Sequence, residues 1–257
     1  MRNCFVLGSG RSGTSMVTGT LANSGYFMGQ HIYPARDGNP KGFFEDEEVN
    51  LINEALLSQV IETRASNHFA RWFFKKRPRK GQMWLARVPL DTCILTPVTV
   101  IKRMQAVVEK QPFCFKDPRF SYTLANWRPF AGDAAFICVF RDPSVTSYSI
   151  MKEHESNRFL RDLVFTFEDA LEVWTLMYSH ILRKHCQQGE WLFLHYDQVL
   201  SGDGLRKIEA FTGAQVDHSF PTPALQRSKS TIPVTEKAHQ LYAELCERAA
   251  YRVPEAV

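Results

Sequence analysis

A cluster of glycine and hydroxyl residues near the start of the chain has the composition of an anion-binding loop. The stretch GSGRSGTS runs from Gly8 to Ser15 and contains one cation, Arg11. A glycine turn of this kind points several backbone N–H groups at one spot, where the amino end of a following helix adds partial positive charge. The stretch therefore predicts a site for a phosphate or sulfate group. The alternative is an ordinary glycine turn that only joins two elements.

The loop departs from the form that binds nucleoside triphosphates. That form, G-x-x-x-x-G-K-[ST], places a lysine on the β- and γ-phosphates and a hydroxyl on magnesium. Gly8 and Gly13 keep the glycine spacing, but Thr14 stands at the lysine position. A kinase of this type would also need an acidic residue that ends a strand, and none is clear. We expect an anion bound without a metal ion.

The residues on both sides of the loop predict the elements that position it. The apolar run Cys4–Leu7 has the character of a buried parallel strand, and residues 14–23 carry apolar side chains at helical spacing. The predicted order is therefore strand, glycine loop and helix.

Two further cations directly follow predicted strands. Lys116 comes after the strand predicted at 113–115, and Arg141 comes after the one at 134–140. Strands that alternate with helices indicate an α/β fold with a mostly parallel central sheet and helices on both faces. Ligands of such sheets bind beyond the carboxyl ends of the strands, so we expect the loop, Lys116 and Arg141 to converge there. Alternatively, Arg141 could be an ordinary surface residue at the end of a strand, and Lys116 an ordinary cation in a turn.

Three motifs together resemble a known family. GSGRSGTS, FKDPR at 115–119 and FRDPSVTSYS at 140–149 are similar to motifs of the sulfotransferases that use 3′-phosphoadenosine 5′-phosphosulfate (PAPS), especially the bacterial and Golgi-type branches. The resemblance implies a P-loop NTPase-like fold and a single domain over 1–257, in which 60–110 could form a helical insert on the substrate side. It also implies metal-independent sulfuryl transfer from PAPS to a hydroxyl or amine, with 3′,5′-adenosine bisphosphate (PAP) as product.

The resemblance also implies which residues bind the donor. The 5′ end of PAPS would lie on the loop, formed by Ser9, Gly10, Arg11, Ser12, Gly13, Thr14 and Ser15. Arg141 and Ser149, eight residues apart, resemble the 3′-phosphate-binding element, with Ser147 as the rival hydroxyl. Arg227, with Ser228 and Lys229, loosely resembles the basic loop near the family's carboxyl terminus; a solvated loop is the alternative.

Catalytic roles follow from the same resemblance. Lys116 resembles the lysine of the tyrosylprotein branch, which offsets charge on the bridging oxygen, and Arg11 would supply further positive charge. Glu45 is the expected general base, because Golgi and mycobacterial members place a glutamate after the first helix. Asp46 and His31 are the alternatives. Glu45 and Asp46 could also serve only the amino end of the next helix.

Composition limits the remaining possibilities. The 257 residues are 44% hydrophobic and 23% charged, with a net charge of +4, which gives no reason to expect a nucleic-acid partner. Six cysteines form no CxxC pair, which favours reduced thiols. No signal peptide, Golgi-type anchor or membrane span is evident, so we expect a cytoplasmic enzyme. A non-catalytic nucleotide-binding protein is the other alternative to an enzyme.

The acceptor does not follow from these residues. Trp72, Phe73, Phe74 and Trp84 could line an apolar pocket, but a core position is the preferred interpretation. The basic run at 75–80 indicates a solvated loop or, alternatively, a patch for an anionic acceptor. A small molecule, glycan or lipid, with its hydroxyl as nucleophile, is the expected partner.

The rest of the chain continues the alternation. Further predicted elements are helices at 47–60, 97–108, 143–154, 166–186 and 205–212, a strand at 191–196, and a last helix capped by Thr235. Thr96 is the expected cap of the helix at 97–108.

Overall fold

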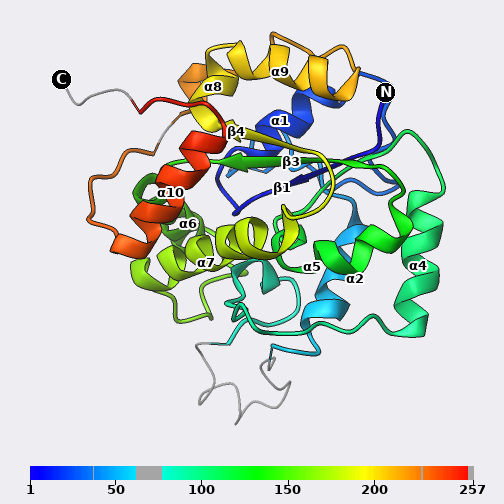
Figure 1. Ribbon diagram of the computed structural model, residues 1–257. Helices are drawn as coiled ribbons and strands as arrows, with labels where there is room; N and C mark the ends of the chain where they lie inside the picture. Colours follow the sequence, from blue (N-terminus) through cyan, green and yellow to red (C-terminus); the bar gives the residue numbers. More distant parts are fainter. Residues whose placement is uncertain (37, 62–76, 227, 254–257) are drawn as a thin grey trace.

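A four-stranded parallel sheet forms the centre of the protein (Figure 1). The computed structural model describes residues 1–36, 38–61, 77–226 and 228–253. The strands lie in the order β2-β1-β3-β4, and their bounds are β1 Cys4–Leu7, β2 Cys114–Lys116, β3 Ala135–Phe140 and β4 Trp191–His195. Phe5 of β1 is in register with Phe115 of β2 and Phe136 of β3. The predicted α/β fold is confirmed.

Alternate side chains of each strand enter different cores, because successive residues of a strand point to opposite faces. Phe5 and Leu7 belong to one buried cluster, whereas Cys4 and Val6 belong to another. Both faces of the sheet are covered by helices, which explains why the strands read as continuous apolar runs.

The helices divide between the two faces (Figure 1). One face is covered by α1 Thr14–Leu21, α8 Tyr196–Leu200 and α9 Asp203–Thr212. The opposite face carries α2 Glu47–Leu57, α4 Val98–Val108, α5 Phe120–Trp127, α7 Phe167–His180 and α10 Glu236–Arg248. Helix α6, Pro143–Ser156, packs against α7. The described residues also form 3-10 turns at Met83–Leu85, Arg128–Phe130 and Pro223–Leu225.

A third buried cluster holds the segment around the Met83–Leu85 turn against the helices. Met83, Leu85 and Val88 pack with Leu57 at the end of α2 and Ile150 of α6. This cluster fixes the position of the turn relative to the glycine loop, which is important for the cleft described below.

Two local predictions were wrong. Thr96 does not cap α4: its Oγ1 accepts a hydrogen bond from Asn126 Nδ2 at 2.9 Å, and Pro97 takes the N-cap position without a side-chain bond. The helix predicted over 166–186 stops being α-helical at His180 and continues as a π-helical turn over Ile181–His185. The predicted cap Thr235 is confirmed, because it accepts from Ala238 N.

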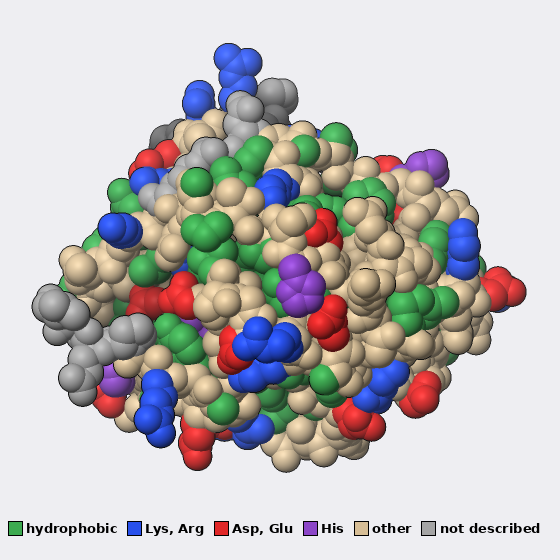
Figure 2. All heavy atoms as spheres, turned by 90° about the horizontal axis from the view of Figure 1, so that it is seen from above, with side chains coloured by type: hydrophobic (Ala, Val, Ile, Leu, Met, Phe, Trp, Pro, Cys, Tyr) green, Lys and Arg blue, Asp and Glu red, His purple; other side chains and the backbone are tan. Residues whose placement is uncertain are grey.

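Charges of both signs are interspersed on the face turned upward in Figure 1, where α8 and α9 lie (Figure 2). No described helix is long and apolar enough to cross a membrane. All six cysteines are free thiols, as predicted.

Candidate active site

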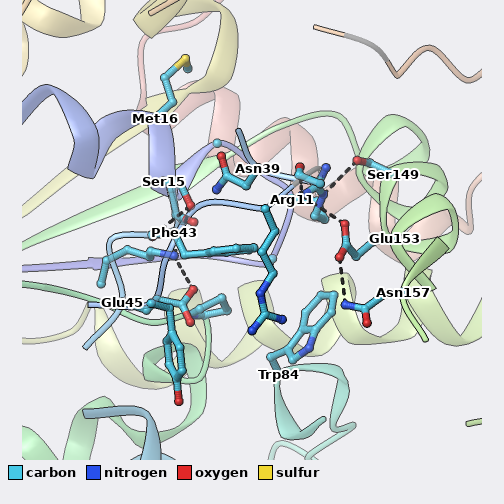
Figure 3. Close-up of a pocket in the computed structure, with 18 of the residues that line it drawn as sticks. Arg11, Ser15, Met16, Asn39, Phe43, Glu45, Trp84, Ser149, Glu153 and Asn157 are labelled. Carbon is cyan, nitrogen blue, oxygen red and sulfur yellow. Dashed lines mark hydrogen bonds and ion pairs between the residues drawn. The ribbon is translucent and has the colours of Figure 1, made fainter. Parts of the chain in front are cut away.

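A cleft of about 940 Å³ opens beside the glycine loop, near the carboxyl ends of β1, β2 and β3. Its walls come from segments that are far apart in the sequence (Figure 3). The loop, the residues around Glu45, helix α6 and the Met83–Leu85 turn all contribute. The cleft is therefore assembled by the tertiary fold and not by one local motif.

The backbone of the loop requires its glycines. Gly8 has a φ of +141°, and a Cβ atom there would lie 2.2 Å from the carbonyl oxygen of Val139 on β3. Gly13, the N-cap of α1, has a φ of +97°, and a Cβ would meet the Tyr196 ring at 2.5 Å. Arg11 adopts a φ of +69° without being glycine. A non-glycine residue in this region is strained, and such strain is often found at functional sites.

Tyr178 of α7 supports the loop from below. Its hydroxyl accepts from Ser9 N at 3.2 Å and lies 3.0 Å from Ser12 Oγ and 2.8 Å from the Val139 carbonyl oxygen. Ser9 and Ser12 are fully buried and do not line the cleft. The loop residues that line it are Gly10, Arg11, Gly13, Thr14 and Ser15. No sequence pattern pointed to Tyr178, because a tyrosine in a long amphipathic helix is typical of a core position.

Lys116 meets two other expected residues at the end of β2. Its Nζ donates to Ser15 Oγ at 3.2 Å and forms an ion pair with Glu45. Lys116 is almost completely buried, whereas Glu45 retains some exposure and both line the cleft. Phe44, just before Glu45, has a φ of +53°, so a strained backbone presents the carboxylate.

The two alternatives to Glu45 lie elsewhere. Asp46 is buried and caps α2: its Oδ1 accepts from Val49 N at 3.1 Å and its Oδ2 from His31 N at 3.0 Å. The side chain of His31 is exposed and does not line the cleft. Of the three candidate bases, Glu45 is the one that lines the cleft.

Arg11 is held by partners from two other segments (Figure 3). Its Nε donates to Ser149 Oγ at 3.3 Å, and its Nη1 donates to the Gly38 carbonyl oxygen at 2.9 Å. Glu153 of α6 lies 3.6 Å from the same Nη1. Ser149 lines the cleft, but its rival Ser147 is fully buried, outside the cleft lining, and its Oγ has no partner among the described residues.

Arg141 follows β3 and is fixed in a mostly buried position. Its Nη2 donates to the Ser228 carbonyl oxygen at 3.2 Å, and its guanidinium lies 4.3 Å from the centre of the Tyr196 ring. Burial lowers the pKa of Arg141 and raises that of Tyr196. Arg227 lies outside the described residues. Lys229 is exposed and does not line the cleft.

A comparison with known protein families assigns the chain. The model described as "Sulfotransferase family" matches residues 4–218. The chain belongs to the sulfotransferase family.

Two solved sulfotransferase domains share the fold. The sulfotransferase domain from the Synechococcus PCC 7002 olefin synthase has a TM-score of 0.50 and 15% identity, over 98% of this chain and 95% of that one. The sulfotransferase domain from the curacin biosynthetic pathway has a TM-score of 0.53 and 13% identity, over 99% of both chains. No curated protein matches. At these identities the likeness shows the fold alone.

Basic side chains outnumber acidic ones in the cleft of this sulfotransferase. Among the described lining residues, eight are Lys or Arg and three are Glu, namely Arg11, Arg36, Lys41, Lys80, Lys116, Arg119, Arg141 and Lys152 against Glu45, Glu54 and Glu153. This excess suits a ligand with several negative charges. No group of three or more His, Cys, Asp or Glu residues within the described ranges is placed to hold a metal ion.

Several lining residues of the sulfotransferase were not anticipated. Lys41 donates to Thr222 Oγ1 at 2.7 Å and lies 4.5 Å from the centre of the Phe220 ring, which joins the segment before Glu45 to the chain after α9. Trp84 lines the cleft and is only partly buried, so the preferred core interpretation was wrong for it. Trp72, Phe73, Phe74 and the first two residues of the basic run at 75–80 lie outside the described residues.

Proposed function

We propose that this sulfotransferase moves a sulfuryl group from PAPS to a hydroxyl, or an amine, of an acceptor and releases PAP. The observation that carries the proposal is the meeting of Ser15, Lys116 and Glu45 in a cleft rich in cations. Sulfuryl transfer, like phosphoryl transfer, depends on positioning and charge stabilisation more than on covalent chemistry from the protein.

The charged and hydroxyl groups of the cleft favour one orientation of the proposed donor. Backbone N–H groups of the loop and the amino end of α1 favour the phosphosulfate end, with Arg11 and Ser15 beside it. Arg141 and Ser149 would bind the 3′-phosphate, because a guanidinium and a hydroxyl make charge-assisted hydrogen bonds to a phosphate monoester. Ser9 and Ser12 are buried, and their backbone N–H groups already donate to the Tyr178 hydroxyl and the Ser9 carbonyl oxygen, so their proposed part is to shape the loop that binds the donor. Arg227 remains a proposed addition to the 3′ site.

The reaction needs one proton acceptor and one stabiliser of the leaving group. Glu45 takes the proton of the acceptor hydroxyl while the oxygen of that hydroxyl attacks sulfur. The bond between sulfur and the bridging oxygen of the donor breaks, and Lys116 donates a hydrogen bond to that oxygen as PAP leaves. Arg11 offsets charge on the outer sulfuryl oxygens. The products are the sulfated acceptor and PAP, with the proton on Glu45 passing to solvent.

The ion pair of Lys116 and Glu45 prepares both groups for these roles. The pair places an amino group and a carboxyl group side by side at the end of β2, and these are the two groups that the reaction requires. When substrates bind, Lys116 turns to the bridging oxygen and Glu45 to the acceptor hydroxyl.

The proposed reaction needs no metal ion and takes place in the cytoplasm. Its acceptor is a small molecule, a glycan or a lipid. Thr14 at the lysine position of the triphosphate-binding loop supports the absence of a required metal ion. The family assignment argues against the kinase alternative.

Thermal unfolding in the presence of ligands tests the donor. PAP without magnesium should raise the unfolding temperature, because a ligand at about 100 times its Kd stabilises a protein by about 2.7 kcal/mol. ATP with magnesium should leave the temperature near that of the free protein. Stabilisation by ATP–magnesium but not by PAP would overturn the proposal. Incubating the protein with sulfur-labelled PAPS and a panel of hydroxyl acceptors then separates an enzyme from a non-catalytic binding protein.

A further inference from the structure

A buried polar cluster lies directly behind Lys116 and connects three segments of the cleft wall. Asp117, Arg119 and Glu54 are exposed by 0%, 3% and 5% respectively. Removing charged groups from water is expensive, and a buried ion pair adds little stability compared with apolar residues of similar size. A cluster of this kind therefore calls for an explanation other than stability.

The contacts of the cluster run from Lys116 to helix α2. Asp117, the neighbour of Lys116, accepts from the side-chain amides of Asn50 and Asn53 at 2.9 Å each. Arg119 connects Asp117 to Glu54 of α2. Its Nη1 donates to Asp117 Oδ1 at 3.0 Å, and its Nε donates to Glu54 Oε1 at 2.8 Å. The end of β2 and one face of α2 are thus fixed to each other.

Glu54 extends the cluster to the opposite wall. Its Oε2 accepts from Gly81 N at 2.8 Å, and its Oε1 accepts from Met83 N at 3.3 Å. These two N–H groups lie at the start of the Met83–Leu85 turn, which carries Trp84. Glu54 therefore sets the position of the turn through its backbone.

Trp84 reaches the middle of the glycine loop. A Cβ atom at Gly10 would lie 2.7 Å from Cε3 and 2.8 Å from Cζ3 of the Trp84 ring, so the ring lies against the bare backbone of Gly10. Figure 3 shows Trp84 among the residues that line the cleft. The ring lines the cleft at the loop that receives the sulfuryl end in the proposed function.

We propose that Trp84 shields the donor's sulfuryl group from water, and that Glu54 and Arg119 are positioning residues that hold it in register with Lys116. This inference rests on the proposed function. A flat apolar ring beside the loop displaces water, which is the competing acceptor at an open cleft. The apolar cluster already packs the turn against the helices, and the two hydrogen bonds from Glu54 add a directional constraint on its backbone.

Intrinsic fluorescence tests the contact without an acceptor. Titration with PAP should change the emission of the parent protein, because the ligand replaces water at the Trp84 ring. Trp84→Phe should lose most of this change and still be stabilised by PAP in thermal unfolding. Trp191→Phe is the matched control, because Trp191 begins β4 outside the cleft lining, with its ring centre 5.0 Å from that of Phe136. The control should keep the change.

Hydrolysis of PAPS without acceptor tests the shielding. In this reaction water attacks sulfur, the bond to the bridging oxygen breaks, and sulfate and PAP form, while the two protons of water pass to solvent or to the 5′-phosphate of PAP. Trp84→Ala should raise the rate of PAP formation at least severalfold. Glu54→Gln should also raise the rate of PAP formation. The control is Glu48→Gln, on the same helix but paired with Arg103 on the surface, which should hydrolyse PAPS at the parent rate.

The double variant decides whether Glu54 acts through Trp84. Residues that act as a unit have non-additive effects, so Glu54→Gln should change hydrolysis little in a Trp84→Ala background. Independent, multiplying effects would overturn the positioning role. If Glu54→Gln does not fold, Arg119→Lys replaces it, because lysine keeps the charge but cannot bond Glu54 and Asp117 together.

Failure of this inference can be told from failure of the proposed function. If PAP does not stabilise the parent protein, the proposed donor is wrong. If PAP stabilises it but Trp84→Phe keeps the full emission change, or Trp84→Ala leaves hydrolysis unchanged, the shielding role is wrong.

Discussion

Lys116 and Glu45 form an ion pair in the cleft, and Lys116 Nζ also donates a hydrogen bond to Ser15 Oγ of the glycine loop at 3.2 Å. The three residues come from the end of β2, the segment before α2 and the start of α1. A carboxylate and a hydroxyl of the glycine loop thus both lie within hydrogen-bond distance of one cation. This is the arrangement that proton removal and leaving-group stabilisation both need.

Glu45→Gln should lower turnover by about 10²–10⁴-fold, which is the usual contribution of general-base catalysis. The acidic limb of the pH–rate profile should disappear, because that limb reports ionisation of the base. The dissociation constant for PAP should change little. Turnover within a few-fold of the parent would show that Glu45 is not the base.

Asp46→Ala provides the contrast. Asp46 caps α2, so its loss should lower the free energy of unfolding by about 0.5–2 kcal/mol while turnover of the folded protein stays near that of the parent. A strong loss of turnover in this variant, with the acidic limb removed, would move the catalytic role to Asp46.

Lys116→Ala should lower the plateau of the pH–rate profile and keep the acidic limb, because the proposed mechanism gives the lysine only the leaving oxygen and makes Glu45 the base. It should also destabilise the fold, since truncation of one partner leaves Glu45 without its counter-charge. Lys116→Arg keeps the charge and is the matched comparison for the stability effect. Loss of the acidic limb in Lys116→Ala would contradict this separation of roles.

Arg11→Ala should abolish turnover and weaken PAP binding less than it weakens catalysis. Arg11 adopts a φ of +69°, so alanine there loses the charge and keeps the backbone strain. Arg11→Gly loses the same charge and relieves the strain. Equal loss of turnover in the two variants would assign the effect to the guanidinium. Normal turnover in Arg11→Gly would assign it to the backbone instead.

Buried histidines should make the protein sensitive to acid. Burial lowers the pKa of His185 to about 3 and that of His195 to about 4, whereas an unfolded histidine titrates near 6.5. Between these values the unfolded state binds more protons, so the free energy of unfolding falls as pH falls below about 6.5. At neutral pH both histidines are uncharged in the folded protein, and their full contribution to the free energy of unfolding is present.

His185→Gln should flatten this dependence by up to about 1.4 kcal/mol per pH unit between pH 4 and 6, measured by urea unfolding. Glutamine can still donate to the Ser121 carbonyl oxygen, which lies 3.1 Å from His185 Nε2. His239→Gln is the control, because His239 is exposed. An unchanged slope in His185→Gln would show that His185 is charged in the folded protein.

The fold was largely predictable because each signal was local. Buried parallel strands are short apolar runs, and the turn after β1 needs glycine wherever the backbone approaches a neighbouring strand, as Gly8 approaches Val139. The rule that parallel strands end at one edge then places Lys116 and Arg141 beside the loop. Such inferences need no knowledge of side-chain packing.

The remaining parts of the site depend on packing between distant segments. Tyr178 and Trp84 touch the loop from α7 and from the Met83–Leu85 turn, and each has the sequence pattern of a core residue. Thr96 was expected to cap a helix, but Asn126 competes for its hydroxyl. Adjacent Glu45 and Asp46 could not be told apart by sequence, because the positive φ of Phe44 and the hydrogen bonds of Asp46 to His31 N and Val49 N appear only in the folded chain.

Arg141→Ala should remove the preference for PAP over adenosine 5′-phosphate, because only PAP carries the 3′-phosphate. Losing one charge-assisted hydrogen bond should cost about 1.5–3 kcal/mol, which corresponds to roughly 10–150-fold in the dissociation constant of PAP. Affinity for adenosine 5′-phosphate should stay the same. Isothermal titration of both ligands gives the comparison directly.

Two further variants make the Arg141 test specific. Ser149→Ala should weaken PAP binding by a smaller factor, since a neutral hydroxyl contributes about 0.5–1.5 kcal/mol. Arg103→Ala, which removes a surface arginine paired with Glu48, should leave both ligands unaffected. Arg141 is already held by the Ser228 carbonyl oxygen and the Tyr196 ring, so its guanidinium needs little ordering on binding. If Arg141→Ala still distinguished PAP from adenosine 5′-phosphate as the parent does, the 3′-phosphate would bind elsewhere in the cleft.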